Sequence, residues 1–279
     1  MIATISPAPL SGKISAIASK SDAHRLLILA ALSEGETFLQ MEQRSEDIDA
    51  TIGCLRALGA RILVLPDGVN VRGIEQVPAH PQLDCGESGS TFRFLLPVAA
   101  ALGARATFTG TGRLPERPIG ELLLAMRAHG VRFSAEQLPF SIEGKFIGGA
   151  FELPGNISSQ YLTGLLLALP LLEQDSRIHL TTPLESAAYV DITLHALKRF
   201  GINIPVRKGE YCISGGQSVQ SPRELRVDGD WSNASFFLAA GALGAPVTVS
   251  GLNLASPQGD KAMLDALMAF GAKVEASTD

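Results

Sequence analysis

Three short segments of this chain contain residue types that bind anions, and the first is Ser19–Arg25. It reads Ser-Lys-Ser-Asp-Ala-His-Arg, so Lys20 and Arg25 stand five residues apart at the start of an expected helix. Backbone N–H groups at a helix N-terminus have no partner, and an ammonium and a guanidinium beside them favour an anionic ligand. Short clusters of Ser, Lys and Arg are also common at solvated helix starts. The residues alone leave both interpretations open.

The other two segments offer related chemistry. Cys85–Thr91 contains two glycines, which let backbone N–H groups approach a ligand closely. Glu116–Gly120 places Arg117 directly before Pro118, a residue suited to the first turn of a helix. Each segment has an ordinary alternative: a strand-to-helix turn for the first, and a solvated arginine for the second.

Hydroxyl groups precede two further expected helices. Ser158, Ser159 and Gln160 supply two hydroxyls and an amide that could hold a phosphate or a carboxylate, and Ser186 and Tyr189 supply two more hydroxyls. Serines at these places also cap helices without any ligand, and the tyrosine could simply be a packed aromatic residue.

Composition and spacing exclude several other classes of function. A net charge of −5 on 279 residues argues against a nucleic-acid partner. The cysteines, at 54, 85 and 212, form no CxxC pair, and the histidines show no metal-ligand spacing, so no disulfide framework or metal site is indicated. No glycine-rich loop matches a dinucleotide or Walker fingerprint. The longest apolar stretch, 162–172, is too short to span a membrane, and the N-terminus does not resemble a signal peptide, so we expect a cytoplasmic protein without a membrane partner.

Four segments that end in glycine indicate how these residues are positioned. Gly59, Gly130, Gly201 and Gly271 are spaced 71, 71 and 70 residues apart, and an alternating apolar segment follows each. A helix that ends in glycine and passes into a strand explains the pattern. The constant spacing predicts a duplicated unit.

Each unit also contains an earlier helix that opens with small polar residues and leads to a β-rich segment, so the unit reads βαβαββ. The expected first helices cover 24–32, 92–102, 161–172 and 236–243; the β-rich segments that follow them cover 37–39, 106–109, 177–180 and 247–250; and the closing hairpins pair 62–65 with 69–72, 132–134 with 140–143, and 202–206 with 211–214.

The fold class expected from this pattern is α/β (α+β), with one complete three-repeat domain and an incomplete second domain of the same kind. We place the complete domain at 13–225 and the partial one at 1–12 with 226–279, with a hinge in the turn-rich stretch 215–222 and a short strand at 4–6. The fourth repeat reaches Asp279 without its last strand, so we expect a truncated chain.

In order along the chain, six segments resemble motifs of the EPSP synthase (3-phosphoshikimate 1-carboxyvinyltransferase) family. The segments are Ser19–Ser21 with Arg25, Gly86–Gly89 with Arg93, Glu116–Gly120, Ser158–Thr163, Tyr189–Thr193 and Gln258–Asp260. The resemblance implies two similar domains of three βαβαββ units each, which close on ligands between them. It also implies a reaction of aromatic amino acid biosynthesis, in which the enolpyruvyl group of phosphoenolpyruvate is transferred to the 5-hydroxyl of shikimate 3-phosphate and phosphate is released.

The resemblance assigns ligand contacts residue by residue. For shikimate 3-phosphate it implies Ser21, Arg25, Ser158, Ser159, Ser186 and Tyr189; for phosphoenolpyruvate it implies Lys20, Gly89 and Arg117, with Gln160 between the two ligands. It implies no metal, no organic cofactor and a monomer at full length. The acid–base groups of the family lie in later repeats, so the catalytic residues are unknown here.

Three departures from the family pattern affect these expectations. Ile17-Ala18 stands where Pro-Gly or Pro-Pro is usual, and Ala187-Ala188 replaces a common Lys-Pro before Tyr189. Six repeats would need roughly 420 residues, and this chain supplies about four repeats. We therefore expect the chain alone to bind its ligands without turnover.

Two alternatives stay open. A noncatalytic anion-binding fragment would retain the same binding residues. The related enzyme that transfers enolpyruvyl to UDP-N-acetylglucosamine commonly has Lys-Asn after the first serine and a cysteine in the loop before the arginine motif, whereas here Ser21 follows Lys20 and 110–116 contains no cysteine.

Overall fold

The computed structural model describes residues 10–277, which fall into two compact units. One unit comprises residues 20–227, and the other combines 10–19 with 228–277. We call them the large unit and the small unit. The strand expected at 4–6 lies outside the described residues. The domain expected at 13–225 stays a prediction.

Three four-stranded sheets with one shared pattern build the large unit. In each sheet a parallel pair of strands is followed by two antiparallel neighbours. The mixed α/β fold expected from the sequence is thereby confirmed. The first sheet runs β13 (Glu224–Arg226), β2 (Glu36–Gln40), β4 (Gly68–Arg72), β3 (Arg61–Leu65); the second β5 (Gln82–Asp84), β6 (Thr107–Thr109), β8 (Phe140–Glu143), β7 (Arg132–Phe133); the third β9 (Ala150–Leu153), β10 (Ser176–Leu180), β12 (Glu210–Ile213), β11 (Val206–Arg207).

The first sheet takes its outer strand from the far end of the unit. Strand β13 pairs parallel with β2, and the Val227 amide then donates to the Gln40 carbonyl at 3.1 Å. The strand that precedes the first helix is instead β1 (Gly12–Ser15), which pairs parallel with β14 (Val247–Ser250) in the small unit. The first sheet of the large unit is therefore completed by a strand that comes from the end of that unit.

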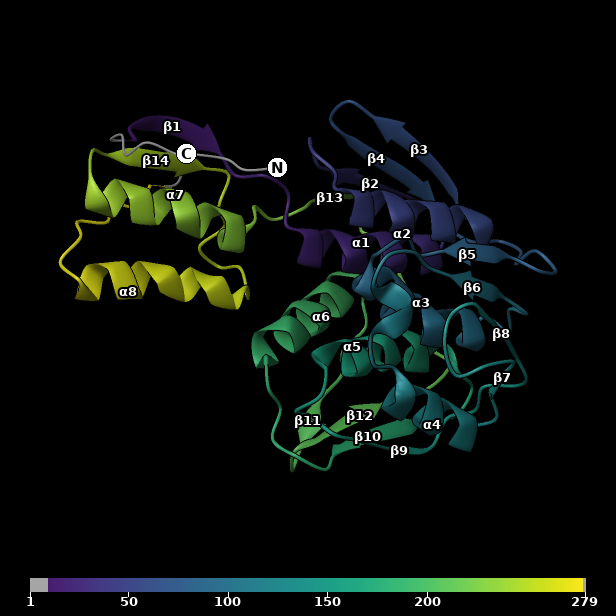
Figure 1. Cartoon of the computed structure of the whole chain (residues 1–279). Helices are drawn as coiled ribbons and strands as arrows, with labels where there is room; N and C mark the ends of the chain where they lie inside the picture. The colour runs from purple at the N-terminus through teal and green to yellow at the C-terminus, as the bar shows by residue number, and fades with distance from the viewer. Residues whose placement is uncertain (1–9, 278–279) are drawn as a thin grey trace. The chain divides into compact units, whose positions relative to one another are not determined.

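Helices fill the space between the sheets of the large unit (Figure 1). Three of them are almost completely buried, and beyond their first two turns they are apolar on every side, as a buried helix must be: α1 (Lys20–Leu32), α3 (Gly89–Ala101) and α5 (Ser159–Ala168). The other three bury one face only: α2 (Glu46–Ala57), α4 (Gly120–Ala128) and α6 (Ala187–Arg199). Most of the anion-binding candidates thus stand near the N-terminal ends of the buried helices.

The four glycines end their helices as predicted. Their φ angles are +109°, +93°, +82° and +89° for Gly59, Gly130, Gly201 and Gly271. A glycine in this left-handed conformation terminates a helix without the steric cost of a Cβ atom.

Prolines account for two differences from the expected elements. The helix expected over 161–172 ends at Ala168 and continues as the 3₁₀ turn η2 (Leu169–Leu171), with Pro170 inside it. The strand expected over 202–206 is reduced to β11, because Pro205 has no N–H to donate.

The stretch 215–222 was predicted as a hinge, and instead it lies inside the large unit. The Gly215 amide donates to Asp175 Oδ1 at 3.0 Å, and the Gln220 amide donates to the Phe200 carbonyl at 2.9 Å. The division between the units falls later, between Val227 and Asp228. Turn-forming residues here make an ordered connection to β13.

The small unit holds two strands and two α-helices: β1, β14, α7 (Trp231–Leu243) and α8 (Met263–Ala269), with the 3₁₀ turn η3 (Gly259–Ala262). Gln258 of the family-like Gln258–Asp260 segment fixes the start of α7, since its Oε1 accepts from the Trp231 amide at 3.1 Å and its Nε2 donates to the Gly229 carbonyl at 2.9 Å. Residues 272–277 form no strand.

Candidate functional site

Helix α1 begins with the first predicted cation. Lys20 is its first residue, and the Nζ atom donates to Asp47 Oδ2 at 2.8 Å. Both side chains are partly exposed, so the pair lies at a surface rather than in the core. Ser21, the next residue, is half-buried, and its carbonyl accepts from Arg25 Nη1 at 2.5 Å. The two halves of the Ser-Lys-Ser…Arg motif are therefore in contact.

Arg25 is buried, and protein atoms hold its guanidinium. Its Nε donates to Thr193 Oγ1 at 2.8 Å, and its Nη2 donates to the Tyr189 carbonyl at 2.9 Å and to Thr163 Oγ1 at 3.4 Å. The group also lies 4.9 Å from the centre of the Phe94 ring. Burial lowers the pKa of Arg25 to about 10, so it keeps its charge at neutral pH. The contacts fix the direction of the guanidinium before any ligand arrives.

At the start of α3, two guanidinium groups converge on a glycine. A Cβ atom added to Gly89 would lie 2.7 Å from Arg93 Nη1 and 3.0 Å from Arg117 Nη1. Neither arginine belongs to any of the salt bridges between described residues. Two cations held close together without a carboxylate favour a ligand that brings negative charge.

Arg93 is the more enclosed of the two arginines. It is 7% exposed, and its Nη1 and Nη2 donate to Gln160 Oε1 and to the Pro118 carbonyl, each at 2.8 Å. Its Nε atom is buried without a hydrogen-bond partner among the described residues. Burial lowers the pKa of Arg93, and the charge of Arg117 lowers it further, while Tyr161 opposes both effects. Arg117 itself is exposed.

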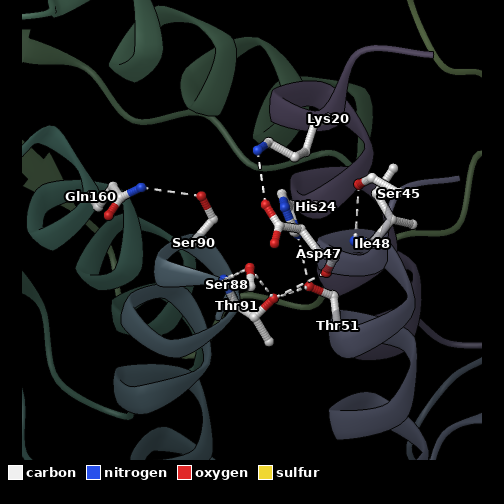
Figure 2. A network of polar contacts seen from close by, with 10 residues as sticks. All are labelled: Lys20, His24, Ser45, Asp47, Ile48, Thr51, Ser88, Ser90, Thr91 and Gln160. Atoms are coloured by element: carbon white, nitrogen blue, oxygen red, sulfur yellow. Dashed lines mark hydrogen bonds and ion pairs between the residues drawn. The ribbon is translucent and has the colours of Figure 1, made fainter. Parts of the chain in front are cut away.

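The start of α5 completes this cluster. Ser158 is the N-cap residue, and its Oγ accepts from the Gln160 amide at 3.2 Å, so the capping alternative for this serine is correct. The Gln160 Oε1 atom accepts from Arg93 Nη1. The Gln160 Nε2 atom donates to Ser90 Oγ at 3.1 Å (Figure 2). Ser159 is half-buried beside them. Gln160 therefore joins α3 to α5 at the place where the two arginines meet.

The start of α6 brings the last two predicted residues. Ser186 has φ +59° and ψ +41°, a left-handed conformation that is rare outside glycine, and its side chain makes no capping bond. Tyr189 is 44% exposed, so the packed-aromatic alternative for it is wrong. Its backbone carbonyl accepts from Arg25, which ties this segment to α1.

All ten predicted binding residues thus lie in the large unit, at the N-caps or in the first two turns of four helices, or in the loop before α4. Arg93 was missing from the predicted site although its motif was recognised. Its position four residues after Gly89 on one helix was the available signal, since such residues share a face. Asp47, which the sequence did not single out, pairs with Lys20. Nothing in the local sequence marks that pairing.

His24, between these groups in the sequence, is buried in the core. Its Nδ1 lies 2.7 Å from Thr51 Oγ1, and its Nε2 has no partner among the described residues. Desolvation, followed by the charge of Arg25, lowers the pKa of His24 from its usual 6.5 to about 3. The imidazole is therefore neutral at physiological pH and packs as a core residue.

The described residues contain no cluster of His, Cys, Asp and Glu able to hold a metal ion, and no helix among them is long and apolar enough to cross a membrane. All three cysteines are free. A hydrogen bond with Cys54, together with burial, raises the pKa of the Cys85 thiol, so this thiol stays protonated.

Comparison with known proteins gives a consistent result. The profile of a family described as EPSP synthase (3-phosphoshikimate 1-carboxyvinyltransferase) matches residues 5–279. The chain is 41% identical over 275 residues to a 3-phosphoshikimate 1-carboxyvinyltransferase of Clostridium perfringens and 38% identical over 275 residues to one of Methanocorpusculum labreanum. Each alignment covers 97% of this chain and 65% of the relative, so the chain spans somewhat less than two thirds of the relatives' length.

A solved structure of EPSP synthase from Acinetobacter baumannii has a similar fold. It superposes with a TM-score of 0.79 at 23% identity, covering 94% of this chain and 59% of the other.

The substitution Gly89→Ala tests the convergence of the two arginines. The new Cβ would displace the flexible ends of Arg93 and Arg117, while alanine is favoured over glycine in a helix. We expect thermal stability to be unchanged or slightly raised, and the affinity for inorganic phosphate to fall about tenfold. Calorimetry and thermal unfolding measure both. Gly120→Ala is the matched control, since Gly120 also begins a helix and a Cβ there meets nothing within 4 Å. Equal phosphate affinity in the two variants would contradict the assignment of an anion site to Arg93 and Arg117 beside Gly89.

The neutral state of His24 predicts a pH dependence of stability. Because its pKa is lowered to about 3 in the folded protein, the unfolded chain binds more protons between pH 3 and 6.5. The free energy of unfolding should therefore decrease as the pH falls through this window, with a contribution near 1.4 kcal/mol per pH unit from this residue. Urea unfolding of the wild type and of His24→Asn at several pH values measures the difference in slope. Parallel slopes would show that His24 titrates normally.

Proposed function

The chain belongs to the EPSP synthase family, and we propose that its large unit binds shikimate 3-phosphate and phosphoenolpyruvate. In a protein of the relatives' length, the enolpyruvyl group would pass to the 5-hydroxyl of shikimate 3-phosphate with release of phosphate. The reaction proceeds by addition and then elimination, and needs no metal or organic cofactor. The relatives compared above carry the corresponding enzyme name.

The observation that carries this proposal is the convergence of Arg93 and Arg117 on Gly89, with Gln160 bonded to Arg93. Phosphoenolpyruvate bears a carboxylate and a phosphate, and guanidinium groups bind both in bidentate fashion. Lys20 adds an ammonium from α1. The cost of holding two guanidiniums together without a counterion is removed when such a ligand binds.

Shikimate 3-phosphate would occupy the neighbouring helix starts. Arg25 is already oriented by Thr193 and by the Tyr189 carbonyl, so its ligand contact requires little reorganisation. The hydroxyl groups of Ser21, Ser158, Ser159, Ser186 and Tyr189 suit the hydroxyl, phosphate and carboxylate groups of this substrate. Gln160 lies beside Ser159 on α5 and would stand between the two ligands.

The same residues do not supply the proton transfers of the reaction. Addition requires a proton for the methylene carbon of phosphoenolpyruvate and a base for the attacking hydroxyl. Asp47 is engaged by Lys20, His24 is buried and neutral, and Glu116 and Asp191 are exposed. That none of these four groups is placed for proton transfer favours the second candidate function, a noncatalytic anion-binding fragment.

Two arginine variants separate the two ligands. Arg25→Ala should cost about 1.5 to 3 kcal/mol of shikimate 3-phosphate binding, because a charge-assisted contact is lost. Arg117→Ala should leave that binding nearly unchanged and weaken phosphoenolpyruvate binding instead. Calorimetry with each ligand measures the difference, and circular dichroism checks that Arg25→Ala, which also removes buried contacts, is folded. Shikimate 3-phosphate affinity that is unchanged in folded Arg25→Ala would remove this residue from the site.

Turnover tests the catalytic part of the proposal. The 279-residue chain given both substrates should release no phosphate above the background rate, because neither proton transfer has a positioned group. Adding the C-terminal third of the Clostridium perfringens relative as a separate polypeptide should restore release. Activity of the chain alone would show that the catalytic groups have been misassigned. Failure of the added segment to restore activity would favour the noncatalytic function.

A further inference from the structure

A chain of buried hydrogen bonds crosses three helices beneath the candidate site (Figure 2). It runs from His24 Nδ1 on α1 to Thr51 Oγ1 on α2, and from there to Thr91 Oγ1 on α3, with both distances 2.7 Å. Both threonines are completely buried, and His24 is 1% exposed. Burying a hydroxyl group is costly unless it is hydrogen-bonded, so these residues hold their partners firmly.

Thr91 is the branching point of this chain. Its Oγ1 lies 2.7 Å from Ser88 Oγ and 3.2 Å from the Asp47 carbonyl, and its backbone amide donates to Ser88 Oγ at 3.1 Å. Ser88 is the N-cap of α3, and Asp47 belongs to the first turn of α2. A single side chain thus connects the beginnings of two helices.

Both connected segments contribute to the candidate site. On the α2 side, the Asp47 carboxylate pairs with Lys20 at 2.8 Å. On the α3 side, Ser88 immediately precedes Gly89, on which the two arginines converge, and Ser90 Oγ accepts from Gln160. The position of Lys20 relative to Gly89 therefore depends on the bonds that Thr91 makes.

Packing alone does not require the hydroxyl group. Valine has nearly the shape of threonine and would fill the same space without a polar atom to satisfy. A threonine whose hydroxyl is shared among three neighbours instead sets the spacing of those neighbours, as buried polar networks do.

We propose that Thr91, with Thr51, is a positioning residue. Together they set the spacing between Lys20 and the Gly89 cluster, which comprises Gly89, Arg93, Arg117 and Gln160, and thereby the affinity for phosphoenolpyruvate. The inference rests on the proposed function for the identity of the ligand. The coupling between the two segments does not depend on that identity.

A second pair of buried threonines provides the comparison within the same unit. Thr193 Oγ1 accepts from Arg25 Nε at 2.8 Å and lies 3.0 Å from Thr163 Oγ1. These residues orient Arg25, which is assigned to shikimate 3-phosphate. Removing the hydroxyl of Thr193 should therefore weaken the binding of shikimate 3-phosphate rather than that of phosphoenolpyruvate.

The first experiment measures ligand binding to the full 279-residue chain by calorimetry. Thr91→Val should weaken phosphoenolpyruvate binding about five- to tenfold and change shikimate 3-phosphate binding less than about twofold. Thr193→Val should weaken shikimate 3-phosphate binding about five- to tenfold and change phosphoenolpyruvate binding less than about twofold. Thr37→Val is the matched control: Thr37 is equally buried, its Oγ1 lies 2.7 Å from Ser221 Oγ, and it stands on β2 outside the candidate site. Thr37→Val should change neither affinity. Equal losses for both ligands in Thr91→Val would overturn the proposal.

The second experiment tests the coupling without any ligand, by NMR. Thr91→Val should shift the ¹⁵Nζ resonance of Lys20, and Thr51→Val should shift the amide resonances of Gly89 and Ser90, each at the far end of the network from the substitution. Thr37→Val should shift neither set. Unmoved resonances in the first two variants would overturn the coupling. A wild-type chain that bound neither substrate would refute the proposed function instead, and the NMR result would still decide the coupling.

Discussion

The constraint on which the site depends is the close approach of Arg93 and Arg117 to the backbone at Gly89, which no residue with a side chain would permit without displacing them. Like charges repel, and desolvation adds to the cost for Arg93. Neutral groups offset part of this: the Gln160 amide oxygen, the Pro118 carbonyl and the Tyr161 ring, whose centre lies 5.7 Å from the Arg93 guanidinium. None of them neutralises the charge. The two cations are therefore already held together before an anion binds. Binding does not include the free-energy cost of bringing them together.

The buried helices connect this cluster to the core. α1, α3 and α5 carry their polar residues in their first two turns, and the apolar remainder of each helix is buried in the interior of the large unit. Burial of the apolar segment therefore determines where Lys20, Gly89 and Ser159 lie. The polar contacts inside the core, such as Thr51 with Thr91 and Thr163 with Thr193, adjust the helices relative to one another. Stability and ligand geometry consequently depend on the same side chains.

Local sequence signals predicted much of this arrangement. The features that depend on contacts between distant segments could not be predicted from them. Gly59 and its three counterparts ended helices as expected, because a left-handed glycine acts within one turn. Gly89 was expected to bring backbone N–H groups close to a ligand; the structure shows that it also makes room for two guanidiniums. The pairing of β13 with β2 joins residues 224–226 to 38–40, and no periodicity in either segment encodes that contact. The Lys20–Asp47 pair and the Thr51–Thr91 bond likewise depend on how separate helices pack.

The neutral state of His24 has a consequence for the electrostatics of the whole site. A protonated imidazole would add positive charge beside Arg25, and desolvation, followed by the charge of Arg25, prevents this. The positive potential at the helix starts then comes from lysine and arginine, which ordinarily stay charged across the neutral range, whereas histidine is the side chain that ordinarily titrates there. A phosphate monoester changes its own charge near pH 6. Between pH 5 and 8 the attraction between site and ligand is therefore governed by ionisation of the ligand, and the protein presents a nearly constant field.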